Sequence, residues 1–226
     1  TMTIRIAHAS DTHNQPSIVR QVADLDVDVL LLTGDMMGNK VNRMYGETVD
    51  AITERAYQTG WFRKHAKKWA QDLNGRPVIS VPGNHDFISI TTWLRHYGVT
   101  VLEITDENPM VEFMGVRFAG FRQVEYLAGE WVGDVRDFDG IIDRVFNCNP
   151  RVLVGHSPPA GILEYGDNEQ DRRGIGALNT ALFRTRDHNV TDHFFGHAHE
   201  SGGQSVTLGG INFHNGAGHI KVHTIG

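Results

Sequence analysis

Residues 27–33 read VDVLLLT, and the chain then passes directly to Gly34 and Asp35. A nearly continuous apolar run of this length is typical of a strand that is buried on both faces, as in a parallel sheet covered by helices. The run ends at a glycine that is followed by a carboxylate. This pattern predicts a buried strand whose carboxyl end presents a polar side chain, and other parts of the chain repeat it.

The first 90 residues predict strands that alternate with helices, and residues 138–196 repeat this alternation. Residues 3–9 (TIRIAHA) alternate and are β-branched, which indicates a strand, and a helix is expected over 16–25 because it opens on proline. Further helices are expected over 47–73 and 91–97, with a strand over 78–81 between them. Strands interleaved with helices in this way imply βαβ units.

The second half of the chain mixes hairpins with further strand and helix pairs. Residues 110–114 and 116–121 are joined by a tight turn, so this stretch, with a strand at 99–104, is expected to be antiparallel. The remaining elements expected are helices over 138–146 and 175–186 and strands over 151–154, 192–195, 204–208, 211–214 and 220–224. The fold class expected is α/β, a mixed sandwich of two sheets flanked by helices. No repeat or linker divides residues 1–226, so we expect a single domain.

Composition narrows the class of protein. The 226 residues are 40% hydrophobic and 21% charged, which is the range of a folded globular chain. No apolar run approaches about 18 residues, and no charged segment followed by an apolar stretch opens the chain. We therefore expect no membrane span, no secretory signal and a cytoplasmic location. The formal charge of −6 argues against a protein that coats duplex nucleic acid.

Cysteine and histidine are used unequally, because Cys148 is the single cysteine beside 13 histidines. One cysteine excludes an intrachain disulfide and any thiolate-rich zinc or iron–sulfur site. A metal must therefore be held by histidine, aspartate, asparagine or glutamate. Such nitrogen and oxygen ligands suit Mn²⁺, Fe, Zn²⁺, Ni²⁺ or Co²⁺ better than Ca²⁺ or Cu⁺.

Five short motifs rich in histidine, aspartate, asparagine and glycine each follow an expected strand. Each motif is weak when taken alone, because such pairs occur by chance in many chains. Their order along one chain makes the set specific. The motifs are Asp11-x-His13, Gly34-Asp35-x-x-Gly38, Gly83-Asn84-His85-Asp86, Gly155-His156-x-Pro158 and Gly196-His197-x-His199. Loops beyond the carboxyl ends of strands converge in α/β sheets, so we expect these side chains to meet.

With these motifs, residues 11–199 resemble the calcineurin-like metallophosphoesterase superfamily. The resemblance implies a four-layer α/β/β/α fold and a centre of two metal ions, with manganese as the first expectation. Matching motif positions implies that one metal is bound by Asp11, His13 and His199, that the other is bound by Asn84, His156 and His197, and that the Asp35 carboxylate bridges both.

The resemblance also implies how the site works. Two metals roughly 3.5–4 Å apart can share a water, lower its pKa to near neutrality and direct the hydroxide in line at phosphorus. His85 is not a ligand in the family pattern and is expected to protonate the leaving oxygen. Asp86 is expected to hold the His85 ring and raise its basicity.

Small departures within the motifs bear on the substrate. Protein serine/threonine phosphatases of the superfamily carry Asp-Arg-Gly in the second motif and Asn-His-Glu in the third. This chain has Asp35-Met36-Met37-Gly38-Asn39-Lys40 and Asn84-His85-Asp86 instead, and it has no broad basic region. We therefore expect the substrate to be a small-molecule or nucleotide phosphodiester. No duplex nucleic acid or membrane is expected as a partner, and the oligomeric state stays open.

Alternative functions remain open at this point. The chain can be a phosphomonoesterase or protein phosphatase, a nuclease of the same superfamily, or a metal-binding protein-interaction scaffold without catalysis. All seven expected ligand positions and His85 are present, which disfavours the scaffold. Substrate selection is expected in loops at 36–46, 122–131 and 164–173, the last as a mobile surface loop.

For three features we expect a structural role rather than a role in binding or catalysis. Arg122 is expected on the surface rather than on a phosphate. The eight histidines that match no motif are expected to be surface or packing residues. A run of basic residues is expected to be a solvated helix face rather than an anion-binding patch, and it comprises Arg63, Lys64, Lys67 and Lys68.

Overall fold

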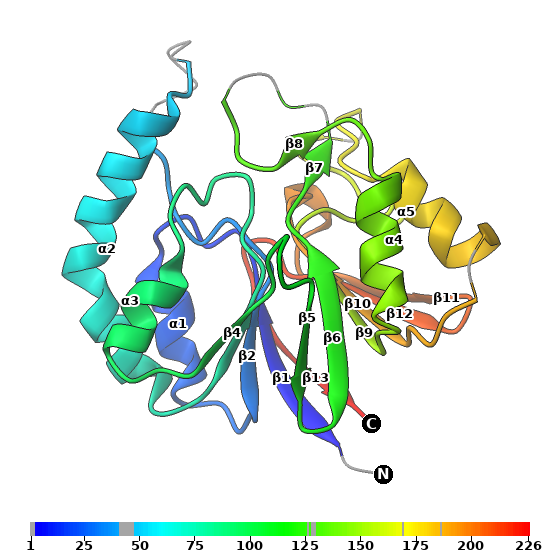
Figure 1. The fold of residues 1–226 in the computed structure, drawn as a ribbon. Coiled ribbons are helices and arrows are strands. Elements are labelled where there is room, and N and C mark those ends of the chain that lie inside the picture. The colour runs from blue at the N-terminus through cyan, green and yellow to red at the C-terminus, as the bar shows by residue number, and fades with distance from the viewer. Residues whose placement is uncertain (1–2, 41–47, 126, 128–129, 169, 186) are drawn as a thin grey trace.

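The computed structural model describes residues 3–40, 48–125, 127, 130–168, 170–185 and 187–226. Two large sheets face each other, and helices cover the outer face of each (Figure 1). The architecture is therefore the four-layer α/β/β/α arrangement expected from the sequence. Among the described residues, no helix is both long enough and apolar enough to cross a membrane.

The first sheet and its helices come from the first half of the chain and its last strand. The elements are β1 Ile4–Ala9, α1 Pro16–Val22, β2 Val29–Leu32, α2 Ala51–Leu73, β3 Val78–Ser80, α3 Ile90–His96, β4 Val101–Glu103 and β13 Ile220–Ile225. The strand order is β13-β1-β2-β3-β4. Strands β1 to β4 are parallel, and β13 pairs antiparallel with β1.

The second sheet comes from the second half of the chain. The elements are β5 Met110–Phe113, β6 Val116–Phe121, α4 Asp139–Asn147, β9 Val152–Gly155, α5 Gly176–Thr180, the π-helix η2 Ala181–Thr185, β10 Asp192–Phe195, the 3-10 helix η3 His199–Ser201, β11 Ser205–Leu208 and β12 Ile211–Asn215. The strand order is β11-β12-β10-β9-β6-β5, parallel except at its two edge strands. The short strands β7 Val124–Glu125 and β8 Asp134–Val135 pair separately.

The structure differs from the expected elements at β4, at the helix expected over 175–186 and at the start of α2, and it adds the short pair β7 and β8. The strand expected at 99–104 is β4, which pairs parallel with β3 rather than antiparallel. The helix α3 carries the chain back to the end of the sheet at which β3 begins, so the next strand, β4, runs parallel to β3. The helix expected over 175–186 is a short α-helix continued by a π-helix.

The long helix α2 begins later than expected. Its first residue is Ala51, where the side chain of Asp50 accepts a hydrogen bond from the backbone amide of Thr53 at 2.9 Å. A carboxylate at this position satisfies an amide that has no partner within the helix. Residue 47 lies outside the described residues. The basic residues of this helix are exposed, as expected for a solvated face.

The position of β2 between two cores explains why its sequence is a continuous apolar run. Leu30 and Leu32 pack into the core beneath the helices, whereas Val29 and Leu31 pack into the core between the sheets. All four side chains are buried. Because both faces of the strand are covered, an alternating pattern would place polar groups in one of the two cores.

Three histidines outside the motifs lie in the space between the sheets. His8 is 1% exposed, and its Nε2 lies 2.9 Å from the hydroxyl oxygen of Thr33. The rings of His214 and His223 have centroids 4.1 Å apart, and Phe194 stacks on His214 at 4.6 Å. These three are packing residues, in agreement with the expectation for histidines that match no motif.

His193 lies on the opposite face of β10, where it packs against Phe195 and Phe213. Neither of its ring nitrogens has a hydrogen-bond partner among the described residues. Burial lowers the pKa of His193 to about 3 and the pKa of His223 to about 4. Both rings are therefore neutral in the folded protein at neutral pH.

Acid should destabilise the fold through these buried rings. An unfolded histidine has a pKa near about 6.5, so below that pH the unfolded chain binds protons that the folded chain does not. For His193 the stability is present above about pH 6.5 and is lost as the pH falls towards the folded pKa of about 3. The loss is about 1.4 kcal/mol per pH unit for each such histidine.

Urea unfolding at about pH 7.5 and about pH 5.5 measures this loss. His193→Phe removes one buried titrating ring, so its stability should fall by about 1.4 kcal/mol less between the two pH values than that of the wild type. His96→Phe is the control, because His96 is exposed, and it should keep the wild-type pH dependence. A wild-type pH dependence in His193→Phe would show that this ring is not responsible.

Candidate metal centre

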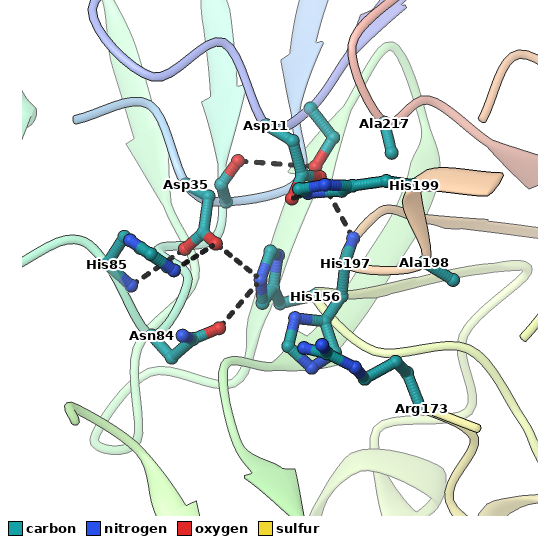
Figure 2. Close-up of polar contacts among 12 residues, drawn as sticks. Asp11, Asp35, Asn84, His85, His156, Arg173, His197, Ala198, His199 and Ala217 are labelled. Carbon is teal, nitrogen blue, oxygen red and sulfur yellow. Dashed lines mark hydrogen bonds and ion pairs between the residues drawn. The ribbon is translucent and has the colours of Figure 1, made fainter. Parts of the chain in front are cut away.

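The five motifs meet at one edge of the two sheets (Figure 2). Asp11 follows β1, Asp35 follows β2 and Asn84 follows β3, whereas His156 follows β9 and His197 follows β10. The strands within each set run parallel, so their carboxyl ends lie together. Because the two sheets face each other, the loops that follow the strands of the first sheet lie against the loops that follow the strands of the second.

One group of possible metal ligands consists of Asp11, His13 and His199. Each offers one ligand atom, and these atoms all lie within 4.8 Å of one another. His199 Nε2 donates to Asp11 Oδ1 at 3.0 Å, and the backbone amide of His197 donates to Asp11 Oδ2 at 2.9 Å (Figure 2). Asp11 therefore ties the first motif to the last.

The second group consists of Asp35, His156 and His197, whose ligand atoms also lie within 4.8 Å of one another. His156 Nε2 is 3.2 Å from Asp35 Oδ2 and 3.1 Å from the amide oxygen of Asn84. The backbone carbonyl of Asp35 accepts a hydrogen bond from the amide of His13 at 3.1 Å. Asp35 therefore lies against both groups.

The orientation of the His156 ring is set by a contact behind it. Its Nδ1 lies 2.7 Å from the backbone carbonyl oxygen of Thr33, so Nδ1 carries the hydrogen and donates. The other nitrogen, Nε2, then faces Asp35 and Asn84. A backbone acceptor that fixes the tautomer in this way is the usual support of a metal-binding histidine.

The ligand loops adopt backbone conformations that most residues avoid. Asp11, Asp35 and His197 have φ angles of 52°, 53° and 65°, in the left-handed region. Such positions persist only where the surrounding structure holds them, and they concentrate at functional sites. Gly34 and Gly83 permit close packing here, because a Cβ at Gly34 would collide with the His156 ring and one at Gly83 with the Asp35 carboxylate.

Burial and neighbouring charges set the charge of the ligands. Burial raises the pKa of Asp11, but the hydrogen bond from His199 and the charge of His156 outweigh it and bring the pKa to about 2. Burial also opposes ionisation of Asp35, yet attraction to His156 holds its pKa well below the ordinary value. Burial lowers the pKa of His197 to about 3 and keeps that ring neutral. The pocket thus presents two carboxylates to a cation.

This donor set fits two divalent metal ions. The donors are imidazole nitrogens and carboxylate or amide oxygens, and the single cysteine, Cys148, belongs to neither group. Two divalent ions would bring about four positive charges, of which the two carboxylates neutralise about two. A chain of net charge −6 can therefore hold a locally cationic pocket.

His85 lies beside the two groups. Its Nε2 is 3.7 Å from Asp35 Oδ2, and its ring packs edge-on against His13 with centroids 4.8 Å apart. On the other side its Nδ1 donates to the side-chain oxygen of Asn39, and Trp131 covers the ring at 4.3 Å. The Nε2 edge of His85 is thus the edge turned to the metal ligands.

The expected contact between Asp86 and the His85 ring is wrong. Asp86 Oδ2 accepts from the backbone amide of Gly83 at 2.8 Å, and Oδ1 accepts from that of Met37 at 2.9 Å. The carboxylate is 5% exposed and satisfies amides of a buried turn that would otherwise lack partners. Asp86 shapes the loop, and Asn39 takes the place on His85 that was expected for it.

Two further side chains hold the loop that carries His85. Gln58 on α2 donates to the backbone carbonyls of His85 at 2.6 Å and Gly38 at 3.2 Å, and its oxygen accepts from the Phe87 amide at 2.9 Å. Arg122 donates to the carbonyls of residues 83 and 86, so it is a partly buried loop clamp rather than the surface arginine expected.

Gln58 was not expected at the site, and Asn39 and Arg173 were expected only as members of loops that select the substrate. A signal for Gln58 exists, because Glu54 and Gln58 continue the i, i+4 row of buried residues on α2 that includes Phe62. Polar residues in such a row point to buried polar partners. For Asn39 and Arg173 no comparable signal is present, since each acts through contacts between loops.

The three loops expected to select the substrate are only partly described. Residues 41–46, 126, 128–129 and 169 lie outside the described residues. The segment 164–173, expected as a mobile surface loop, contains the buried Glu164 and is hydrogen-bonded through Gly166 to Glu200, next to the candidate ligand His199. It brings Arg173 next to His197 (Figure 2).

Comparison with known proteins adds an independent result. A family profile described as calcineurin-like phosphoesterase matches residues 4–201. Among solved structures, the protein TT1561 of Thermus thermophilus is similar with a TM-score of 0.61 and 12% identity, covering 99% of this chain and 98% of that one. A dimetal phosphatase from Danio rerio is similar with a TM-score of 0.54 and 13% identity, covering 98% and 91%. No curated protein matches the chain.

At these identities the two solved structures establish a shared fold only. The family profile goes further, because its match of residues 4–201 includes all five motifs and both groups of candidate ligands. The chain belongs to the calcineurin-like phosphoesterase family.

Proposed function

We propose that this protein is a manganese-dependent phosphodiesterase acting on a small-molecule or nucleotide phosphodiester. Family membership supports hydrolysis of phosphoric esters. The observation that carries the proposal is the position of His85 beside two adjoining ligand groups, with its Nε2 3.7 Å from Asp35. A leaving oxygen held at that edge would lie within reach of a proton donor.

The chain supplies a preorganised set of ligands. One metal ion would be held by Asp11, His13 and His199 and the other by Asn84, His156 and His197, with Asp35 against both. When bound, two divalent ions supply an activated water near neutral pH and neutralise charge on the phosphoryl oxygens. The protein keeps the ligands in place through backbone contacts, such as that of His156 Nδ1 with Thr33.

His85 would give the leaving oxygen a proton from Nε2, which requires the doubly protonated ring because Nδ1 already donates to Asn39. Burial lowers the pKa of His85 to about 4, so the negative charge of a bound phosphodiester would have to stabilise that form. The hydrogen bond from Nδ1 to Asn39 fixes which edge of the ring faces the site, and Trp131 packs against the ring and limits access of water. A positioned proton donor contributes about 10²- to 10⁴-fold in rate, and the contribution grows as the leaving group becomes more basic.

A diester is favoured over a protein or a polymer. The second and third motifs depart from the protein phosphatase pattern at Gly38-Asn39-Lys40 and at Asp86. The presence of His85 beside both ligand groups supports an enzyme over a scaffold. A panel of diesters, cyclic nucleotides and monoesters, each assayed with several metals, tests the substrate class. Faster turnover of monoesters would overturn the diester preference.

Hydrolysis of bis(p-nitrophenyl) phosphate should require the metal centre. Protein treated with a chelator should be inactive, and Mn²⁺ should restore turnover. Asp35→Asn removes the carboxylate charge from the second ligand group, so it should lower metal affinity by more than about 100-fold and lower kcat/KM with it. Metal content by mass spectrometry and initial rates measure the two effects.

Asp192→Asn is the matched control for this substitution. Asp192 is also buried and bonded to a histidine, His214, but it lies at the start of β10, away from the ligand loops. This variant should keep wild-type metal content and activity. Metal content and turnover that survive in Asp35→Asn would contradict the assignment of Asp35.

His85→Ala should keep both metals and lose the proton donor. Diesters with poorly acidic alcohol leaving groups should slow by about 10²- to 10⁴-fold, whereas p-nitrophenyl esters should slow much less. Comparison of kcat across a series of leaving groups measures the difference. Asn39→Ala should show the same trend in weaker form, because the ring remains but loses its orienting partner. Equal slowing of all leaving groups would argue against a role of His85 in proton transfer.

A further inference from the structure

Arg173 is a cation beside the metal centre that neither ligand group uses. Figure 2 shows its guanidinium next to the ring of His197. Arg173 Nη2 lies 3.9 Å from Asp167 Oδ2, and Asp167 Oδ1 lies 4.0 Å from Nδ1 of His199, a candidate metal ligand. Since its side chain is 22% exposed, Arg173 lies at the rim of the site and is open to a ligand.

The segment 164–173 that carries this arginine is attached to the site at Gly166 and, two residues past its end, at Ile175. Glu200, one residue after a candidate ligand, donates its backbone amide to the carbonyl of Gly166 at 2.8 Å. Ile175 donates its amide to the carbonyl of Pro158, two residues after another candidate ligand, at 2.9 Å. The position of Arg173 is thereby coupled to the positions of the metal ligands.

The guanidinium is aimed by a two-point contact with Asp171. Nε donates to Asp171 Oδ1 at 2.7 Å, and Nη2 donates to Oδ2 at 2.6 Å. Parallel hydrogen bonds of this kind fix the plane of the guanidinium. The pair packs over Gly166, where a Cβ would collide with the Asp171 carboxylate and with Arg173 Nε. The contact uses Nε and Nη2, so Nη1 is the nitrogen that it leaves for a second acceptor.

The neighbouring Arg172 behaves differently. It pairs with Glu164, lies over the ring of Tyr165 at 5.5 Å and is 60% exposed. Two adjacent arginines thus share one segment and each has an acidic partner, but Arg173 is the one that Asp167 connects to the candidate ligand His199. Arg172 is a matched control for charge and for position in the chain.

We propose that Arg173, oriented by Asp171, binds a non-bridging phosphoryl oxygen of the substrate. This inference rests on the proposed phosphoesterase function. The planar fork of arginine matches the oxygens of a phosphate better than the single ammonium group of lysine. The carboxylate of Asp171 balances the positive charge of Arg173. We therefore expect Arg173 to stabilise bound phosphate through the orientation of its hydrogen bonds more than through net charge. Lysine should therefore replace Arg173 poorly.

Binding of inorganic phosphate to the Mn²⁺-loaded protein, measured by calorimetry, tests the proposal without depending on turnover. Arg173→Gln should weaken phosphate binding by about 10- to 100-fold, the range for a charge-assisted hydrogen bond. Arg173→Lys should recover only a small part of the affinity. Arg172→Gln should bind phosphate as the wild type does. Metal content is measured for each variant, and affinity is expressed per loaded site.

Phosphate affinity equal to that of the wild type in Arg173→Gln would overturn the proposal while leaving the phosphodiesterase function in place. If Arg173→Gln fails to fold, Arg173→Lys decides, and full affinity in that variant would likewise overturn it. Conversely, a wild type that hydrolyses no ester but loses phosphate affinity on substitution of Arg173 would reject the proposed function and keep the binding site.

Discussion

The buried contact between Asp35 and His156 joins the two sheets at the edge where the motifs meet. Asp35 follows β2 of the first sheet and His156 follows β9 of the second, and their side chains approach to 3.2 Å. The other nitrogen of His156 is bound to the backbone of Thr33. A buried charge is costly without its partner, so each residue requires the other in place. The packing of the sheets and the spacing of the ligands therefore depend on the same pair.

The ligand loops are strained, and the sheets below them are not. Left-handed backbone at residues such as Asp11 and Asp35 costs about 1–3 kcal/mol each. The strands that lead into these loops end in two apolar cores, where side chains such as Leu32 and Phe194 are buried. Rigid strands thus hold loops that would not adopt these conformations alone, which is the usual arrangement of a site built on a scaffold.

Histidine has three different roles in this chain, and its surroundings decide which one applies. Burial acts to lower the pKa of His156, but the facing carboxylate of Asp35 outweighs it and raises the pKa to about 9. His193 packs among aromatic rings and has a lowered pKa, so it acts as a packing residue. His85 is the proposed proton donor. One of its ring nitrogens bonds the side-chain oxygen of Asn39, and the other faces the metal ligands. The high histidine content is thus only partly explained by the metal centre.

Most of the strands, the α/β class and the residues that gather at the strand ends could be predicted from the amino-acid sequence. These are local properties, since apolar runs such as that of β2 and the polar motifs that follow are read within a few residues. Contacts formed in the folded chain place Asn39 rather than Asp86 on His85 and bring Gln58 and Arg173 to the site. These contacts join segments far apart in the chain. Which side chain meets which depends on how the loops and helices pack at the end of each sheet, and no local pattern encodes that geometry.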